Sequence, residues 1–576
     1  MIKNLFTAIM LILAAACSQT EQQPVSPADK ATAFRDSIRK VKEARFAEAT
    51  LVSANEIREI IETRQPGDRY KARGVSLYSS VLLPKLYIEN DFNLLWIIHF
   101  DSLNKVNEMA TFLEGIVFHG LIPEHYHAAE IRQSLTELAN DSALIFNAAF
   151  LANLDLLLSD AWFMAASHLY FGKIDPESLE AQWGIRRDKP DIPFDRYLKT
   201  MLRQETVEKG FWHFYPPHPG YAAMVAEAER LTAIKGGDFS IKTDLKNSSL
   251  KPGDSSAYIA EIKRKLAFLG LYTPDTLTHP DKYDERMAES VKKLQEQFGF
   301  NTDGAIGKNA LKALNMTVEQ RINQLYINME RLRWMPDSLE HTYIQVNIAD
   351  FSLDVFRGGD TLVRMRTIVG KEYRETPVFN ARISYLVFSP SWTVPPTIQR
   401  NDVVPEVRKN TGYLAGKNMK VYDPKGKLMD PASINWNRDG MRYTIRQLPG
   451  PQNALGKVKF MFPNKHNVYL HDTPSRNLFA RDERTFSSGC IRIEKPYDLA
   501  LILMSDMEGW TPERIRQAMD AGIERTVVLK NPPGVYLTYL TAWATKEGVI
   551  HYRSDIYKRD AEMLKALKNL HTKWNT

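Results

Sequence analysis

The sequence predicts a multidomain α+β protein in which helical domains come first and a mainly β domain follows. Apolar residues recur at helical spacing through most of residues 31–235, and again through residues 254–341. From Thr342 onward the apolar residues alternate with polar ones, which is the pattern of half-buried strands. With 576 residues, the chain has room for about four domains of ~150 residues each.

Composition narrows the class of protein. Hydrophobic residues make up 44% of the chain and charged residues 25%, which is typical of globular domains. The formal net charge of +6 is small for this length, and no run of basic residues occurs. The charge therefore predicts no nucleic-acid partner, although it suits an anionic polymer.

The first residues have the pattern of a lipoprotein-type signal peptide. Lys3 precedes an apolar run, residues 5–16, whose last small residues lead directly to Cys17. The run is too short to span a bilayer as a helix. We expect residues 1–17 to be a signal segment with lipid on the cysteine, followed by a flexible tether, residues 18–30. The alternative is cleavage after Ala16 or nearby without attachment of lipid, which would leave Cys17 as a free thiol.

Residues 31–235 form the first predicted domain, which is helical. Its most apolar stretch covers residues 148–171, where Asp155 and Asp160 interrupt the run. We therefore expect a buried core helix there rather than a second membrane span. The stretch Gly236–Ser256, rich in Gly, Ser, Lys and Asp, is a predicted linker.

A smaller three-helix domain is predicted for residues 254–316. Met287, Val291, Leu294 and Phe298 fall on one face of a helix. A turn that contains glycine follows and precedes a last short helix. The pattern therefore predicts a compact helical unit.

A connecting helix, residues 317–341, leads into the predicted β domain, residues 342–531. Two alternating strands that meet at the glycine pair 358–359 predict a β-hairpin, and further strands and two late helices follow. Residues 396–446, rich in charge, Gly and Asn, are a predicted insertion. The last residues, 532–576, are predicted to be a C-terminal helical segment.

Cys490 is the candidate nucleophile. If Cys17 carries lipid, Cys490 is the one remaining thiol in an oxidising compartment and has no disulfide partner. Gly489 leaves access to the sulfur, and His471 follows an apolar, strand-like run. Cysteine attacks as a thiolate, and imidazole generates thiolate near neutral pH. The pair is therefore interpreted as nucleophile and base.

Three separated blocks resemble the L,D-transpeptidase family. They are His471-Asp-Thr with Ser-Ser-Gly-Cys490-Ile-Arg492, the stretch Pro449–Pro463, and Ser391–Pro396. The likeness is closest to the large multidomain branch of Gram-negative envelopes, which has serine before Gly-Cys, as Ser488 is here. Residues 254–316 resemble a peptidoglycan-binding domain, and the helical region before them resembles the scaffold domain of that branch.

The resemblance implies an acyltransferase that builds peptidoglycan and is acylated by carbapenems. Cys490 would attack the carbonyl between the third residue of a donor tetrapeptide stem and its terminal D-Ala, releasing D-Ala and forming a thioester. An acceptor amine would then give a 3→3 cross-link. His471 would act as general base and acid, oriented by a group that the sequence does not name, for which a backbone carbonyl is one candidate. The insertion, residues 396–446, would be a lid or else a surface elaboration.

The tetrahedral intermediate requires an oxyanion hole. Backbone N–H groups of Gly489 and Cys490 are candidates, with the Tyr469 hydroxyl as a third donor. Tyr469 lies two residues before His471, so both side chains face the same side of a strand. A packing role for the tyrosine is the alternative.

Three further residues are candidates for binding substrate. Arg492 would pair with a stem carboxylate, because a guanidinium suits bidentate binding, or would serve in a structural ion pair. Ser488 belongs to the motif. Trp392 would form one wall of the donor site or would pack in the hydrophobic core.

No cofactor is predicted. The sequence has no phosphate-binding loop and no Gly-rich turn in a strand-to-helix context. Some histidines recur at short spacing, but no acidic or thiol ligands lie at a useful spacing from them. No metal site is therefore expected at His125, His127, His213 or His218.

The resemblance also implies partners and a location. Tetrapeptide stems would be donor and acceptor, and glycan strands would bind residues 254–316 unless that domain only packs. A carboxypeptidase and a glycan polymerase would be partners. Lipid on Cys17, followed by Ser18, would anchor the protein to the outer membrane on its periplasmic side. Two other functions remain: an L,D-carboxypeptidase with water as acceptor, and a non-catalytic lipoprotein that anchors the wall.

Overall fold

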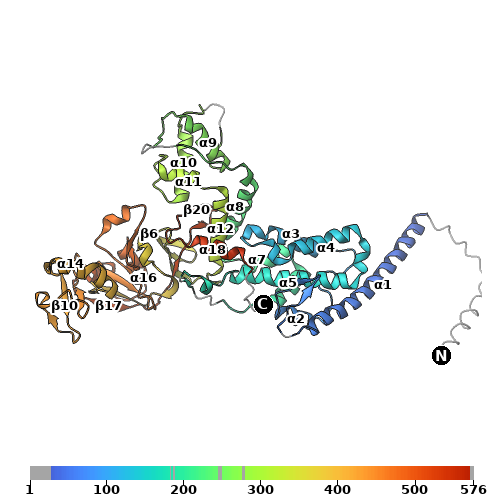
Figure 1. Cartoon of the computed structure of the whole chain (residues 1–576), viewed down its shortest axis with the longest axis horizontal. Helices are drawn as coiled ribbons and strands as arrows, with labels where there is room; N and C mark the ends of the chain where they lie inside the picture. The colour runs from blue at the N-terminus through green and yellow to red at the C-terminus, as the bar shows by residue number, and fades with distance from the viewer. Residues whose placement is uncertain are drawn as a thin grey trace, which may run out of the picture. The chain divides into compact units, whose positions relative to one another are not determined.

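The protein is described by a computed structural model covering residues 27–65, 67–181, 183–185, 189–243, 249–274 and 279–570 (Figure 1). The predicted signal segment and Cys17 lie outside these residues. The first helix begins at Pro27, so the end of the predicted tether 18–30 is helical. The chain divides into two compact units, one holding residues up to 109 together with 130–160, the other holding the rest.

The first unit is built from helices. Its elements are α1 (Pro27–Glu62), the hairpin β1 (Lys71–Ala72) and β2 (Val75–Ser76), α2 (Leu82–Ile88), and parts of α3 (Asn104–Gly115), α4 (Ala128–Asn140) and α5 (Ala148–Phe171). Among the described residues, α5 alone is long and apolar enough to cross a membrane, but 78% of its most apolar window is buried in the protein. The prediction of a core helix is therefore confirmed.

The two aspartates within α5 anchor loops. Asp155 is buried and accepts hydrogen bonds from the Tyr87 hydroxyl at 2.6 Å and from the N–H of Trp96 at 2.9 Å. Asp160, also buried, accepts a hydrogen bond from the N–H of Ser79 at 2.6 Å. Buried carboxylates require such partners, which explains acidic residues inside an apolar helix. Burial raises the pKa of Asp155 to about 6.

The predicted domain 31–235 contributes residues to both compact units. Its later helices belong to the second unit: α6 (Phe194–Gln204), α7 (Val207–Trp212) and α8 (Tyr221–Ile234). The reason is that the apolar face of α8 is shared with a later helix, α12 (Val318–Arg333). Met224 and Leu231 pack in one core with Ile322 and Leu325.

The three-helix domain is present as predicted. It consists of α9 (Ala257–Phe268), α10 (Glu285–Phe298) and α11 (Lys308–Leu314), drawn as one group in Figure 1. Met287, Val291 and Leu294 are fully buried in its core, and Phe298 packs against that core. Asp284 caps α10 by accepting a hydrogen bond from the N–H of Met287.

The connecting helix α12 runs through the second unit and is mostly buried. It begins with a capping box formed by Thr317 and Gln320. Near its end, Arg333 donates to Glu330 at 2.8 Å, and neither side chain is exposed to solvent. Glu330 also accepts from the N–H of Ile174 at 2.6 Å, so the pair joins α12 to the end of α5.

The β domain is a mixed sheet. Its strand order is β17 (Arg525–Val528), β8 (Tyr385–Phe388), β13 (Val458–Met461), β14 (Leu470–His471), β16 (Ile491–Ile493), β6 (Asp360–Gly370), β5 (Ser352–Arg357), β4 (Thr342–Asn347), β18 (Gly534–Thr538), β7 (Val378–Arg382) and β3 (Trp183–Gly184). The predicted hairpin at glycines 358–359 joins β5 to β6. The two late helices are α16 (Pro496–Leu503) and α17 (Pro512–Asp520).

The prediction of a helical segment for residues 532–576 is wrong. β18 lies inside the sheet between β4 and β7, and the hairpin β19 (Ala542–Ala544) and β20 (Ile550–Tyr552) follows before a single helix, α18 (Asp560–Lys568). All five residues of β18 are buried, so it has no exposed face and no alternation to mark it as a strand.

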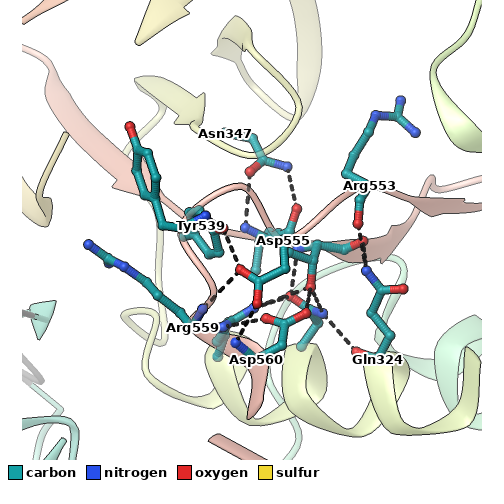
Figure 2. Close-up of polar contacts among 12 residues, drawn as sticks. Gln324, Asn347, Tyr539, Arg553, Asp555, Arg559 and Asp560 are labelled. Carbon is teal, nitrogen blue, oxygen red and sulfur yellow. Dashed lines mark hydrogen bonds and ion pairs between the residues drawn. The ribbon is translucent and has the colours of Figure 1, made fainter. Parts of the chain in front are cut away.

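Polar contacts fix this C-terminal segment to α12 (Figure 2). The Tyr539 hydroxyl donates to Asp555 at 2.6 Å, and the same carboxylate accepts from the N–H groups of Arg559 and Asp560. Gln324 of α12 donates to the carbonyl of Arg553 at 2.7 Å. The segment is therefore an ordered part of the β domain.

The insertion, residues 396–446, is folded and has its own core. It contains α13 (Pro396–Ile398), a π-helical turn (Gln399–Val403), α14 (Val404–Lys409), α15 (Gly412–Gly416), β10 (Met419–Tyr422) and β11 (Leu428–Met429). Its strands pair with β12 (Thr444–Gln447) and β9 (Trp392–Thr393). Val404, Val421 and Trp436 are among its buried residues.

Candidate active site

The candidate catalytic residues lie on two neighbouring parallel strands. β14 and β16 pair with His471 opposite Arg492. The N–H of Ile491 donates to the carbonyl of Tyr469 at 3.1 Å, which continues the pairing back to Cys490. Side chains two residues apart on a strand share a face. The sheet therefore brings the predicted nucleophile, base, tyrosine and arginine to one face.

The ring of His471 is oriented by the backbone. Its Nδ1 lies 2.5 Å from the carbonyl oxygen of Asp472, and the ring is buried. A carbonyl only accepts, so Nδ1 carries the proton and Nε2 is the basic nitrogen. Burial, together with the charge of Arg492, lowers the pKa of His471 to about 3. The imidazole is therefore neutral at pH 7.

The thiol of Cys490 is also neutral in the resting protein. Burial raises its pKa, while hydrogen bonds from Tyr469 and the charge of Arg492 oppose this, and the net direction is upward. Its Sγ lies 3.8 Å from the carbonyl oxygen of Asn467. A neutral thiol beside a neutral imidazole attacks only if the imidazole takes the proton as the sulfur–carbon bond forms.

Tyr469 connects the nucleophile to Trp392. Its hydroxyl hydrogen-bonds with both Cys490 and Trp392, and burial raises its pKa, so it remains a proton donor. The rings of Tyr469 and His471 lie 5.7 Å apart between centroids. Trp392 reaches the site through this hydroxyl and also packs against the core of the insertion.

Arg492 is a half-buried cation beside the nucleophile. Its Nε is buried and makes no hydrogen bond, and it forms no ion pair within the described residues. Burial lowers its pKa, and the neighbouring Cys490 opposes this. The structural ion pair considered for Arg492 is therefore not present there. A guanidinium without a partner suits a carboxylate of the substrate.

The turn that carries the nucleophile depends on glycine. Gly489 has φ of +113°, which side chains rarely adopt. Its N–H donates to Ser487 Oγ at 3.1 Å, so this predicted oxyanion donor is already engaged. The N–H of Cys490 has no acceptor in the described part of the chain. Together with the Tyr469 hydroxyl, it is the better oxyanion donor.

Ser488 connects the turn to the insertion. It is exposed, and its Oγ accepts a hydrogen bond from Arg374 Nη1 at 2.8 Å. The same Nη1 lies 2.8 Å from Asp402 in the π-helical turn of the insertion. A direct role of Ser488 with substrate stays a prediction.

Asp472 holds the histidine strand in place. It is buried, and its carboxylate accepts from the N–H of Lys457 at 2.8 Å and from Arg476 at 2.8 Å. Gly456 packs so tightly there that a Cβ would lie 2.4 Å from Asp472 Cγ. The carboxylate thus fixes the residue whose carbonyl orients His471.

Comparison with known proteins identifies the domain that carries this site. A family model described as the L,D-transpeptidase catalytic domain matches residues 341–508. This domain belongs to the L,D-transpeptidase family. A model described as the scaffold domain matches residues 81–227, and one described as "Putative peptidoglycan binding domain" matches residues 255–314.

Similar proteins are known by sequence and by structure. A protein of Haemophilus influenzae, named "Putative L,D-transpeptidase", is 36% identical over 248 residues, which are 42% of this chain and 50% of that protein. The chain therefore spans about half the length of this relative. An L,D-transpeptidase from Mycobacterium smegmatis matches at 14% identity, covering 34% of this chain and 58% of its own, with a TM-score of 0.17. One from Stackebrandtia nassauensis matches at 12%, covering 52% and 96%, with a TM-score of 0.19.

Sequence reasoning missed two residues of the transpeptidase domain that hold the nucleophile turn. Thr376 Oγ1 donates to the carbonyl of Gly489 at 2.9 Å and accepts from the N–H of Gly370 at 2.9 Å. The Tyr557 hydroxyl donates to the carbonyl of Gly370 at 2.7 Å and accepts from the N–H of Thr376 at 3.2 Å. Tyr557 lies beyond the end of the family match, and no spacing in the sequence points to it.

We expect Thr376→Val to slow acylation of the transpeptidase domain by about 10²-fold, because a small misplacement of the nucleophile costs that much. Valine keeps the shape of threonine but leaves the buried carbonyl of Gly489 without its donor. Thr376→Ser keeps the hydroxyl and should remain close to the parent. The measurement is the rate of carbapenem adduct formation by mass spectrometry. Equal rates for the two variants would contradict the role of the hydroxyl.

We expect Arg492→Gln to move the pH profile of Cys490 alkylation to higher pH. The charge of Arg492 lowers the pKa of the thiol, so its removal raises that pKa and less thiolate is present at any given pH. Arg492→Lys keeps a positive charge and should shift the profile less. The rate of reaction with iodoacetamide, followed from pH 6 to 10, measures it. A profile that moves to lower pH in Arg492→Gln would contradict this.

Proposed function

We propose that this protein is a peptidoglycan L,D-transpeptidase that forms 3→3 cross-links through a thioester on Cys490. The observation that carries the proposal is the pairing of β14 with β16. His471 lies opposite Arg492 in this pairing, on the strand next to the turn that carries Cys490, and its Nδ1 proton is bound to the carbonyl of Asp472. The basic Nε2 is then available to the thiol.

In the acylation step, the sulfur of Cys490 attacks the carbonyl carbon of the third residue of the donor stem. The proton of the thiol moves to His471 Nε2 as the C–S bond forms. The Cys490 N–H and the Tyr469 hydroxyl donate hydrogen bonds to the resulting oxyanion. The C–N bond to the terminal D-Ala then breaks, and His471 returns the proton to the leaving amine.

In the transfer step, the side-chain amine of a second stem attacks the thioester carbonyl. His471 takes a proton from the nitrogen, the C–S bond breaks, and the thiolate recovers a proton from His471. A stem carboxylate bound to Arg492 would reduce the positive field at the imidazole. This would make His471 a stronger base than in the empty site, because Arg492 lowers its pKa there.

Product analysis by mass spectrometry tests the proposal. The parent protein and Cys490→Ala are incubated with purified tetrapeptide muropeptides. Dimers that lack one D-Ala, absent with Cys490→Ala, are the expected result. Tripeptide monomers without dimers would replace the proposal by an L,D-carboxypeptidase, and products that persist in Cys490→Ala would exclude the thioester.

We also propose the lipid anchor at Cys17, periplasmic location and glycan binding by residues 254–316. The signal pattern supports the first two, and the family match to residues 255–314 supports the third. Labelling of cells with a radioactive fatty acid, lost in Cys17→Ser, tests the anchor. Label retained by that variant would exclude it.

A further inference from the structure

The first half of α1 is exposed to solvent on all sides. Every side chain from Lys30 to Arg45 is exposed, whereas Phe46 is buried. Arg45 lies over the Phe146 ring, 4.6 Å from its centroid, where the packed half of the helix begins. Figure 1 shows the first half of α1 extending past α2 and α4. Residues 30–44, which we call the free half of α1, therefore form about four exposed helical turns.

Three large apolar residues form a stripe along the free half. Phe34, Ile38 and Val41 recur at spacings of four and three residues, so their side chains share one face of the helix. They are 67%, 42% and 61% exposed. Most of the stability of a helix in a protein comes from the packing of such a face. This apolar stripe is therefore a candidate docking surface.

The apolar stripe does not continue the packed face of α1. Phe46 follows Phe34 by 12 positions, which turns the helix by about 120° away from the stripe. Val52 follows Phe34 by 18 positions, or about five full turns, and so returns to the side of the stripe. Val52 is 42% exposed although it belongs to the packed half. The side of α1 that carries the stripe therefore faces solvent in both halves.

The charged residues of the free half are arranged around the stripe by sign. Arg35 and Lys42 each follow a stripe residue by one position, so they lie about 100° around the helix and border the stripe. Lys30 lies one turn before the stripe, on its side of the helix. Asp36 and Glu43 follow stripe residues by two positions, which places them about 200° around, on the opposite face. Cations thus border the apolar stripe, and these carboxylates lie away from it.

This arrangement is typical of a helix that lies in the plane of a membrane surface. The apolar face of such a helix enters the boundary between headgroups and acyl chains, and Lys and Arg beside that face reach anionic headgroups. A second copy of the chain fits the stripe less well. A coiled coil requires apolar positions sustained over several heptads, but the next two positions of the stripe after Val41 are Arg45 and Glu48.

The start of α1 is close to the proposed lipid anchor. Nine residues separate Cys17 from Pro27, where α1 begins. Even a fully extended chain of this length spans only about 30 Å. A lipid on Cys17, as proposed above, holds the free half within reach of the membrane surface.

We propose that the free half of α1 binds the surface of an anionic phospholipid bilayer and lies parallel to it. The apolar stripe enters the apolar layer, and the bordering cations Lys30, Arg35 and Lys42 bind lipid phosphates. The first unit is thereby held at the membrane by a protein surface in addition to lipid. The binding requires neither lipid on Cys17 nor the chemistry at Cys490.

Flotation with phospholipid vesicles tests this binding. The chain from Ser18 onward is used, because the apolar run 5–16 and a lipid on Cys17 would themselves bind vesicles. The described residues begin at Pro27, so this truncation removes none of the described contacts. The parent is expected to float with vesicles of phosphatidylethanolamine and phosphatidylglycerol, and to bind vesicles of phosphatidylcholine alone much more weakly.

Two double variants separate the apolar contribution from the charged one. Phe34→Ala with Ile38→Ala keeps the helix propensity and should weaken binding by about 10²-fold, since each large apolar side chain contributes about tenfold when buried. Arg35→Gln with Lys42→Gln should weaken binding to the anionic vesicles by about tenfold. The second variant should leave the weak binding to phosphatidylcholine unchanged.

Matched controls lie elsewhere on the same helix. Leu51→Ala removes an apolar side chain that is 70% exposed but lies about 120° away from the stripe. Arg39→Gln with Lys40→Gln removes the same charge as the variant of the bordering cations. It does so on the far side of the helix, where Arg39 pairs with Glu43 at 3.0 Å. Both controls should bind nearly as well as the parent.

Three results would overturn the inference. The first is a parent that does not float with anionic vesicles. The second is equal binding by the parent, the two double variants and the controls, which would place the lipid contact elsewhere on the protein. The third comes from sedimentation velocity without vesicles: a parental dimer that Phe34→Ala with Ile38→Ala converts to a monomer would assign the stripe to a contact between two copies. None of these results bears on the product analysis with Cys490→Ala, so the proposed function stands or fails separately.

Discussion

His471→Gln is expected to slow acylation of Cys490 by about 10²–10⁴-fold, the usual contribution of a general base. The thiol is neutral at rest because burial raises its pKa, so the attack depends on a base to take its proton. Glutamine keeps a polar side chain of similar length but has no basic nitrogen. The measurement is the rate at which a carbapenem forms a covalent adduct, followed by intact mass.

A control separates loss of the base from loss of structure. His551→Gln changes a histidine of β20 that is also largely buried and whose pKa burial lowers. It should acylate at the parental rate. If His471→Gln acylates as fast as the parent while both variants unfold at the parental temperature, the thiol does not need this imidazole.

Glu330→Gln is expected to destabilise the second unit by about 3–5 kcal/mol, because breaking a buried ion pair leaves an uncompensated charge. Arg333 and Glu330 are fully buried, and the arginine would be left with neutral partners alone, among them the Tyr221 hydroxyl and the carbonyl of His119. Glu330 accepts from Arg333 with one oxygen and from the N–H of Ile174 with the other. Glutamine has a single accepting oxygen, so one of the two contacts would be lost and the junction of α5 with α12 would loosen. Urea unfolding followed by tryptophan fluorescence measures the loss, since Trp334 directly follows α12.

The surface of the three-helix domain offers a matched control. Lys292 and Glu289 form an ion pair of the same spacing on α10, but both side chains are exposed. Glu289→Gln should leave the unfolding midpoint unchanged, because exposed pairs contribute little. If both substitutions shift the midpoint equally, burial of the Arg333–Glu330 pair does not explain its contribution.

Much of the fold followed from local pattern. The period of apolar residues indicated α10, the hairpin of β5 and β6, and the late helices, because each buries one face and exposes the other. The pattern was uninformative for β18, whose side chains are all buried, and for β3, which has two residues. Both strands are defined by their partners in the sheet and not by their own sequence.

The candidate site also contains residues that the sequence pattern predicts and residues that it does not. The proposed nucleophile and base, Cys490 and His471, stood out by chemistry and motif, since an unpaired thiol and an imidazole after a strand are unusual together. The residues that position them did not stand out. Thr376 and Tyr557 act by single hydroxyl groups bound to backbone, and hydroxyl residues are common in any sequence.

The sequence by itself indicated the candidate nucleophile, the candidate base and the family to which the domain belongs. These depend on the identity of side chains and on spacing within a strand or turn. Only the tertiary structure decided that the Asp472 carbonyl orients His471, that His471 Nε2 is the basic nitrogen, and that Arg492 has no counter-ion among the described residues. The physical reason is that these features arise from contacts between residues far apart in the chain, which close packing brings together and no local pattern records.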